Sequence, residues 1–370
     1  MRVLNNPAGV AEDDPILQLP KVSLHDHLDG GLRPATLIEL AASIGHELPA
    51  TEPEALAQWY YDSASSGDLV RYLETFSHTV AVMQSREGLM RVAKEWVLDQ
   101  VADGVFYAEA RWAPEQHLEG GLELDEVVDA VQQGLEAGVI EASSDGKFIR
   151  VGQIITAMRQ ADNSMAIAEL AIRHREKGSE SGVVGFDIAG PENGFPPSAH
   201  LSAFNALHQA YVPVTIHAGE AAGKASIHEA LTVCHAQRIG HGARIVEDMD
   251  IVEGEGQLGS LAAWVLDQQI PLELCPSSNL QTDIGGTIAS HPITGLKDLG
   301  FAVTINPDNR LMSATSVTRE MRRLVDEAGW TQTDLEWATV NAVTAAFLPL
   351  DVRERMLDEI LIPGFARVNI

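Results

Sequence analysis

The sequence predicts a single (β/α)8 barrel, in which eight parallel strands alternate with helices around a closed sheet. Short apolar runs rich in β-branched residues recur along the chain, and segments with helical periodicity separate most of them. This alternation predicts a parallel sheet with right-handed crossovers, and eight is the number of strands that closes a barrel. The length of 370 residues, of which 45% are hydrophobic, suits one domain, because α/β barrels reach this size as single units.

Eight segments have the pattern expected of the barrel strands. The first is predicted from Val22 and Leu24, which alternate with polar neighbours up to His27. The other strands are expected at residues 104–112, 148–155, 183–188, 212–217, 238–242, 270–274 and 301–305. Helices are expected at residues 34–44, 124–135, 166–174, 199–209, 225–234, 258–267, 316–327 and 334–347. Thr331 and Asp334 have the spacing of a capping box, which is typical of a helix start.

A helical insertion is expected after the first strand, because residues 46–102 contain no clear strand. The apolar residues that recur there at helical spacing include Leu69, Tyr72, Leu73 and Phe76. Long connections in compact domains often form lids or pocket walls, so this segment is a candidate lid. The competing interpretation is that these side chains are simply core. Residues 1–14 are polar and are expected to form a loose N-terminal arm of the single domain, which spans residues 1–370.

The charge balance argues against nucleic acid or a membrane as a partner. The chain has 25 Lys+Arg and 53 Asp+Glu, a formal net charge of −28, and such a surface repels phosphate backbones and anionic lipid. Cys234 and Cys275 are too few for a disulfide framework or a thiolate zinc site. We find no pattern of a signal peptide and no apolar run long enough to span a membrane, so a cytoplasmic location is expected. The sequence does not indicate the oligomeric state.

Residue types that bind metals follow several of the predicted strands. His25 and His27 end the first strand and point the same way, because they are two residues apart. His217 ends the fifth strand, and Asp308 follows the eighth. Active sites of (β/α)8 barrels lie at these strand ends, so the three imidazoles and the carboxylate are expected to converge. This set suits one Zn²⁺ with water completing its coordination, and zinc lowers the pKa of that water toward ~7.

Two further polar residues are expected beside these ligands. Glu220 lies three residues after His217, and His241 ends the sixth strand, so both are candidate acid–base groups. The alternative to one metal ion is a two-metal site, which usually needs a bridging ligand, often a lysine, at the end of the fourth strand. Residues 183–192 contain no lysine, which favours a single ion.

Five short motifs occur in order along the chain. They are residues 21–30 (KVSLHDHLDG), 187–192 (DIAGPE), 217–220 (HAGE), 238–242 (RIGHG) and 303–309 (VTINPDN). Together they resemble the motifs of the adenosine deaminase family, which are zinc-dependent (β/α)8 hydrolases acting on purine nucleosides. The resemblance covers about residues 19–348. It implies deamination of adenosine, and of 2′-deoxyadenosine, to inosine and ammonia in purine salvage, by a zinc-activated hydroxide that attacks C6 of the purine.

The resemblance also implies roles for individual residues. The implied ligands of one Zn²⁺ per chain are His25, His27, His217 and Asp308. Glu220 matches the proton donor to purine N1, for which burial should raise its pKa, and His241 matches the residue that orients and helps to deprotonate the attacking water. The implied substrate-binding residues are His27, Asp29, Gly190 and Asn309, with Asp29 at the ribose and the Gly190 backbone at the purine.

Asn309 departs from the family pattern, which often has a second carboxylic acid directly after the zinc-binding aspartate. An acid at this position must stay protonated to donate a hydrogen bond to purine N7, whereas an amide NH₂ donates at any pH. The contact with N7 is therefore compatible with Asn309, but the preference among 6-aminopurines stays open.

Other functions compete with this interpretation. Adenine deaminases and aminodeoxyfutalosine deaminases resemble the chain broadly, but they tend to have Glu where this chain has Asp29, which favours a nucleoside. The acidic surface and the chain length disfavour an AMP deaminase. Zinc deaminases of nucleic acids use a His/Cys/Cys site with a P-C-x-x-C motif, which this chain lacks. A non-catalytic binding barrel predicts a broken ligand set, and every ligand position here is filled.

Overall fold

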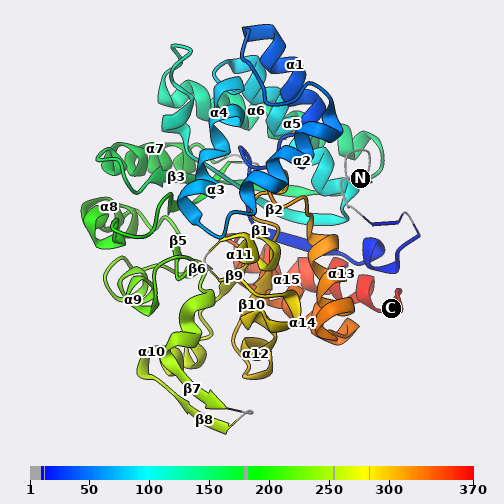
Figure 1. Cartoon of the computed structure of the whole chain (residues 1–370), viewed down its shortest axis with the longest axis vertical. Helices are drawn as coiled ribbons and strands as arrows, with labels where there is room; N and C mark the ends of the chain where they lie inside the picture. Colours follow the sequence, from blue (N-terminus) through cyan, green and yellow to red (C-terminus); the bar gives the residue numbers. More distant parts are fainter. Residues whose placement is uncertain (1–9, 12, 179–181, 253–254, 283) are drawn as a thin grey trace.

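The computed structural model describes residues 10–11, 13–178, 182–252, 255–282 and 284–370. In this part of the chain, eight parallel strands surround one axis (Figure 1). They are β1 (Lys21–His27), β2 (Val105–Trp112), β3 (Arg150–Met158), β4 (Val183–Ala189), β5 (Thr215–Ala218), β6 (Arg238–His241), β9 (Leu272–Leu274) and β10 (Val303–Ile305). Hydrogen bonds order them as β1-β2-β3-β4 and as β10-β9-β6-β5. The predicted (β/α)8 barrel is confirmed.

Two short bridges join these two sheets into a closed barrel. Between β4 and β5, the backbone N–H of Phe186 donates to the carbonyl of Pro213 at 2.9 Å. Between β10 and β1, Asp308 N donates to the carbonyl of His25 at 3.0 Å, and His27 N donates to the carbonyl of Asp308 at 2.9 Å. This second seam brings Asp308 next to the two histidines of β1.

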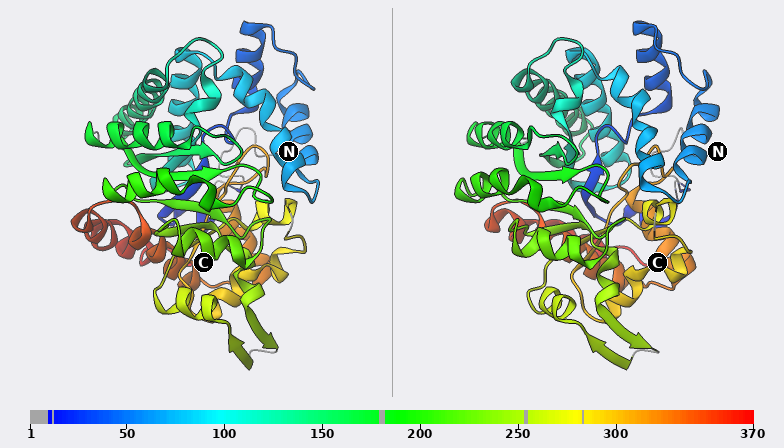
Figure 2. Two further views of the ribbon diagram at one scale, coloured as in Figure 1. Left: turned by 90° about the vertical axis from the view of Figure 1, so that its left-hand side faces the viewer. Right: turned by 60° about the vertical axis from the view of Figure 1, so that its left-hand side comes forward.

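Helices cover the outside of the barrel (Figures 1 and 2). Those that follow the successive strands are α6 (Leu124–Ser144), α7 (Ser164–Glu176), α8 (Leu201–Gln209), α9 (Lys224–Thr232), α10 (Ser260–Asp267), α11 (Pro276–Gln281), α12 (Pro292–Asp298), α13 (Val317–Ala328) and α14 (Gln332–Ala345). The chain ends with α15 (Leu350–Met356), a π-helical segment (Leu357–Leu361) and α16 (Ile362–Phe365). Short 3-10 helices lie at Pro15–Gln18, Pro114–His117, Pro197–His200, Ala243–Asp248 and Ile288–Ser290. The capping box of Thr331 and Asp334 is present at the start of α14.

The long connection between β1 and β2 is mainly helical. It contains α1 (Pro34–Ile44), α2 (Pro53–Ala64), α3 (Leu69–Glu74), α4 (Phe76–Val82) and α5 (Arg86–Ala102). In Figure 1 the α1, α4 and α5 helices gather at the end of the molecule opposite the β7–β8 hairpin, which is formed by Met249–Val252 and Glu255–Leu258. Residues 46–102 therefore have the helical character expected of them.

Several element boundaries differ from the predicted ones. The third strand begins two residues late, at Arg150, and runs on to Met158. The fifth begins at Thr215, because Pro213 before it has no N–H for the ladder and uses its carbonyl to bridge Phe186 instead. The antiparallel β7–β8 hairpin was not predicted, because its strands are short and pair with each other outside the barrel, and Figure 2 shows it projecting from the body. The α11 and α12 helices between β9 and β10 were also not predicted.

Most of the predicted N-terminal arm, residues 1–14, lies outside the described residues. Asp14 itself is held in place: its side chain accepts a hydrogen bond from Ile16 N at 2.9 Å and another from Arg322 Nε at 3.0 Å. Cys234 and Cys275 are buried free thiols. No helix among the described residues is long and apolar enough to cross a membrane.

Lys21 begins β1 with a fully buried ammonium group. Its Nζ donates to the carbonyls of Leu17 at 3.1 Å and Leu19 at 2.8 Å. Burial lowers the pKa of Lys21 from 10.5 to about 8, although the charge of Asp103 opposes the shift. The folded chain therefore releases this proton more readily than the unfolded chain.

We predict that Lys21 makes stability rise with pH between about 8 and 10.5. In that window the unfolded chain binds more protons than the folded chain, so the free energy of unfolding increases with pH, by a total on the order of 3 kcal/mol. Lys21→Met removes this contribution and also removes the donor to two carbonyls. Urea unfolding across this range should show the stability of the unaltered protein rising with pH relative to that of Lys21→Met. Parallel curves would contradict the prediction.

Candidate metal centre and active site

The ends of β1, β5 and β10 bring three imidazoles and one carboxylate together. His27 Nε2 lies 3.3 Å from His217 Nε2. Asp308 Oδ1 lies 3.3 Å from His27 Nε2 and 3.5 Å from His25 Nε2. Ligand atoms of the three histidines all lie within 4.8 Å of one another, as one shared ion requires. The strand-end convergence expected from the sequence is therefore present in the structure.

The chemical state of these side chains fits a bound metal ion. His25 Nε2 is buried and has no hydrogen-bond partner, which is an unfavourable state for a polar atom unless something binds it. Burial holds the pKa of His27 and of His217 well below 6.5, so both rings are neutral and present lone pairs. Burial alone would raise the pKa of Asp308, but the neighbouring imidazoles hold it well below its usual value. Three imidazoles and one carboxylate match the ligand types of Zn²⁺.

A second group of potential ligands overlaps the first. His25, His241, Cys275 and Asp308 also place ligand atoms within 4.8 Å of one another. The Cys275 thiol, however, donates to the carbonyl of Glu273 at 3.4 Å, and burial raises its pKa well above 9. A protonated thiol is a poor metal ligand, so the histidine–aspartate set is the better match.

Buried acids orient two of the histidine rings from behind. His25 Nδ1 lies 3.0 Å from Glu273 Oε2, and His217 Nδ1 lies 2.8 Å from Asp187 Oδ2. Arg111 links the two acids, with Nη1 at 3.0 Å from Asp187 and Nη2 at 2.6 Å from Glu273. Because the outer ring nitrogens face carboxylates, the inner ones are left to face the metal position.

Arg238 adds a second cation to this network. Its Nε lies 2.6 Å from Glu273 Oε1, and it also pairs with Glu109 on β2. Burial alone would raise the pKa of Glu273, but Arg111 and Arg238 hold it well below 4.5. The roles of these residues were not predicted from the sequence. The signal that could have found them is an ionisable residue inside an apolar strand, where burial demands a partner of opposite charge.

Asp308 is fixed through both its backbone and its side chain. Its φ of 60° is in the left-handed region, and its backbone forms the seam with β1. Ser278 Oγ donates to Asp308 Oδ2 at 2.6 Å, and Asn309 Nδ2 donates to Asp308 Oδ1 at 2.8 Å. Asn309 is buried against Gly30, whose lack of a side chain leaves room for it, since a Cβ there would lie 1.9 Å from Asn309 Oδ1.

The two predicted acid–base residues are neighbours. His241 Nε2 lies 3.6 Å from Glu220 Oε2, and both side chains are buried. Burial holds the pKa of His241 well below 6.5, so its ring is neutral. The ring centroid of His241 lies 4.6 Å from that of His25 and 5.3 Å from that of His217. The pair therefore stands directly beside the candidate metal centre.

Glu192 fixes the turn that carries Glu220. Its carboxylate accepts backbone hydrogen bonds from four consecutive residues, Gly219, Glu220, Ala221 and Ala222, at 2.6, 3.0, 2.7 and 2.8 Å. Glu192 belongs to one of the five sequence motifs, but its role was not predicted. Four charge-assisted bonds to one carboxylate leave that turn little freedom, so the position of Glu220 depends on Glu192.

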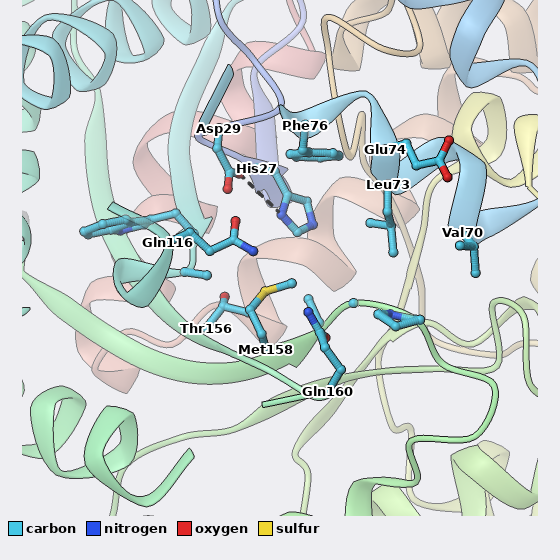
Figure 3. Close-up of a pocket in the computed structure, with 15 residues that line it drawn as sticks. His27, Asp29, Val70, Leu73, Glu74, Phe76, Gln116, Thr156, Met158 and Gln160 are labelled. Carbon is cyan, nitrogen blue, oxygen red and sulfur yellow. Dashed lines mark ion pairs between the residues drawn. The ribbon is translucent and has the colours of Figure 1, made fainter. Parts of the chain in front are cut away.

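A cavity of about 320 Å³ opens beside the metal centre (Figure 3). Of the predicted substrate-binding residues, His27, Asp29 and Gly190 line it. Glu220, His241 and Asn309 are not among its lining residues. Gly190 has a φ of 108°, which suits glycine and exposes its backbone at the cavity. Burial raises the pKa of Asp29 to about 7.

The α3 and α4 segments form one wall of the cavity. Val70, Leu73, Glu74 and Phe76 line it, and Figure 3 shows Leu73 and Phe76 on that side. Leu69 and Tyr72 are instead buried. The apolar face predicted from the sequence is therefore divided, with two of its residues packed inside and two directed at the cavity.

Comparison with known proteins agrees with this site. The model of the adenosine deaminase family matches residues 20–362. The chain belongs to the adenosine deaminase family. The match includes all five sequence motifs and covers nearly the whole length of the chain.

Individual family members are similar over almost the same span. The chain is 53% identical to adenosine deaminase 1 of Streptomyces coelicolor over 98% of this chain and 92% of that protein. It is 54% identical to adenosine deaminase of Mycobacterium tuberculosis over 94% of each chain. A solved structure of adenine deaminase from Arthrobacter aurescens shares the fold, with a TM-score of 0.79, 23% identity, and coverage of 94% of this chain and 98% of that one.

We predict that the protein purifies with about one zinc ion per chain and that His217→Ala removes it. The variant loses one of the four candidate ligands and leaves Asp187 without its histidine. Metal analysis of both proteins checks this. His174→Ala, which changes a buried histidine on α7, is the matched control and should retain zinc. Full zinc occupancy in His217→Ala would exclude His217 from the ligand set.

Proposed function

We propose that this protein is a zinc-dependent adenosine deaminase, which hydrolyses adenosine to inosine and ammonia. The observation that carries the proposal is the grouping of His25, His27, His217 and Asp308 beside the Glu220–His241 pair at the mouth of the barrel. Membership of the adenosine deaminase family, at more than half identity to curated adenosine deaminases, supports it. The 2′-deoxynucleoside is proposed as a second substrate.

The cavity favours a nucleoside over a nucleotide. Among the described residues that line the cavity there is no lysine or arginine, whereas Asp29 and Glu74 both line it. A 5′-phosphate would therefore meet carboxylates with no cation to pair with. This composition disfavours AMP as a substrate. It is compatible with an uncharged ribose, whose hydroxyls donate well to Asp29.

The metal ligands are proposed to be His25, His27, His217 and Asp308. When bound, Zn²⁺ supplies Lewis acidity that makes water a nucleophile at neutral pH. A solved structure of an amidohydrolase from Burkholderia ambifaria with bound zinc, which shares the fold at 21% identity and a TM-score of 0.79 over 97% of this chain and 95% of that one, is consistent with a metal in such a barrel.

Residues beside the ligands are proposed to bind the purine and handle protons. Glu220 donates a proton to ring N1, which makes C6 more electrophilic, and the turn fixed by Glu192 keeps it in position. His241 orients the attacking water. The Gly190 backbone contacts the purine, and Asp29 binds the ribose.

Asn309 is proposed to face purine N7. One hydrogen of its Nδ2 is used by Asp308 at 2.8 Å, and the amide group has a second hydrogen that N7, which has only a lone pair, accepts. In this arrangement the residue both supports the metal ligand and recognises the base.

A spectrophotometric panel tests the function directly. It measures loss of the 6-amino group from adenosine, 2′-deoxyadenosine, adenine, AMP and aminodeoxyfutalosine. The proposal requires the highest kcat/KM for adenosine or its 2′-deoxy form. A higher value for adenine or aminodeoxyfutalosine would replace it with one of the alternative functions. The cytoplasmic location remains a prediction from the sequence.

Glu220→Gln should retain zinc while kcat falls by roughly 10²-fold or more, the usual scale of general acid–base catalysis. The amide keeps the shape of the side chain but lacks an acidic proton. Steady-state kinetics with adenosine and metal analysis measure the two effects. A kcat close to that of the unaltered protein would mean that another group carries the proton.

Glu192→Gln should lower both stability and kcat without loss of zinc. The change weakens four charge-assisted bonds and costs about 1–3 kcal/mol, because one amide hydrogen now faces backbone donors. Asp248→Asn is the matched control: Asp248 accepts from Leu261 N and Ala262 N, away from the site, so its loss should reduce stability alone. Equal kcat in the two variants would contradict the role of Glu192.

Leu73→Ala should mainly affect KM, and Leu69→Ala should mainly affect stability. Leu73 lines the cavity, so its truncation should raise KM about 5-fold or more with a small change in stability. Leu69 is buried on the same helix, so its truncation should cost about 2–4 kcal/mol of stability and leave KM unchanged. If Leu73→Ala reduced stability and left KM unchanged, Leu73 would be a core residue and not part of a lid over the substrate.

A further inference from the structure

A chain of hydrogen bonds runs behind His241. Asn279, on α11, places Nδ2 3.1 Å from His241 Nδ1 and Oδ1 3.2 Å from His291 Nε2. His291 is the N-cap of α12, and its Nδ1 accepts from Ile293 N at 3.1 Å. The three side chains are at most 3% exposed, so little water competes for these bonds. The chain thus connects a backbone amide to a residue of the proposed active site.

The backbone amide of Ile293 determines the direction of every bond in this chain. A backbone N–H only donates, so His291 Nδ1 accepts, and a neutral His291 carries its hydrogen on Nε2. Burial lowers the pKa of His291 to about 3, which keeps the ring neutral. Nε2–H therefore donates to Asn279 Oδ1, so the amide nitrogen of Asn279 faces His241 and donates to its Nδ1.

We infer that Asn279 is a positioning residue that holds His241 as the tautomer with its hydrogen on Nε2. Because Nδ1 already accepts from Asn279, a neutral His241 ring has no other place for that hydrogen. Nε2–H then points into the site, on the side of Glu220, whose Oε2 is 3.6 Å away. None of the comparisons or motifs assigns a role to Asn279 or His291.

The catalytic consequence rests on the proposed function. A His241 with Nε2–H meets the attacking oxygen as a hydrogen-bond donor, so it orients that oxygen and stabilises negative charge on it. Nε2 has no lone pair with which to accept a proton from the water. His241 therefore keeps the expected role of orienting the attacking water. It does not take the expected part in deprotonating that water.

Nuclear magnetic resonance of the zinc-loaded protein, with ¹⁵N in its histidines, tests this assignment. Long-range ¹H–¹⁵N correlations report which ring nitrogen bears hydrogen, and the His241 signals are identified by their loss in His241→Gln. In the unaltered protein Nε2 should be of the protonated type and Nδ1 of the unprotonated type. The metal-free protein should give the same result, because the chain of bonds does not involve the metal ligands.

Asn279→Asp reverses one bond and retains the shape of the side chain. A carboxylate only accepts, so the His241 hydrogen should move to Nδ1, while His291 keeps its acceptor. The kcat for adenosine should fall on the order of 10²–10⁴-fold, the scale at which a catalytic histidine in the wrong tautomer loses activity, with KM nearly unchanged.

Asn341→Asp is the matched control. Asn341 Nδ2 donates to the carbonyl of Val303 at 3.2 Å, so this variant loses a similar bond outside the chain and should alter only stability. Hydrogen on Nδ1 of His241 in the unaltered protein would overturn the inference without use of any variant. An Asn279→Asp variant that keeps the Nε2–H signal would overturn it as well. Absence of adenosine deamination together with an Nε2–H signal would instead reject the proposed function and leave the tautomer assignment intact.

Discussion

The buried guanidinium of Arg111 holds together the two acids on which the candidate metal centre depends. Asp187 and Glu273 come from β4 and β9, on different sides of the barrel, and each contacts one histidine ring. Without a cation between them, two buried carboxylates would take up protons rather than stay ionised. A protonated acid would then offer a donor where the imidazole needs an acceptor. Buried ion pairs are weak evidence for stability, because desolvation of the charges offsets much of their attraction. What the contacts of this network do fix is the orientation of the His25 and His217 rings.

The same arrangement explains which residues sequence analysis found. Ligands such as His25 and His27 follow apolar strands, and barrel topology alone brings such strand ends together. Residues that orient the ligands lie inside strands, where Arg111 or Glu273 looks like an interruption of an apolar pattern. Their partners come from strands far away in sequence, so no spacing links them. The fold and the convergence of the candidate ligands were therefore predictable from the sequence, whereas the charged residues that support them could be found only from the structure.

Loops set the limit of prediction for the acid–base residues. Glu220 was recognised from its motif, but its position depends on Glu192, which lies in the loop after the previous strand. The four N–H groups that donate to Glu192 point toward its carboxylate only when the turn has formed. The β7–β8 hairpin and the start of the fifth strand were missed for a related reason: short ladders are decided by individual partners, such as the Pro213 carbonyl, rather than by periodicity.

The seam at Asp308 has a consequence for how the protein is made. The first two histidines of the candidate ligand set belong to the first strand of the barrel, and the carboxylate of Asp308 follows the last strand. A nascent chain still lacking β10 on the ribosome has the imidazoles but neither the carboxylate nor the backbone bonds that join the ends of the barrel. If the candidate ligands bind the metal, its tight binding would require a completed chain.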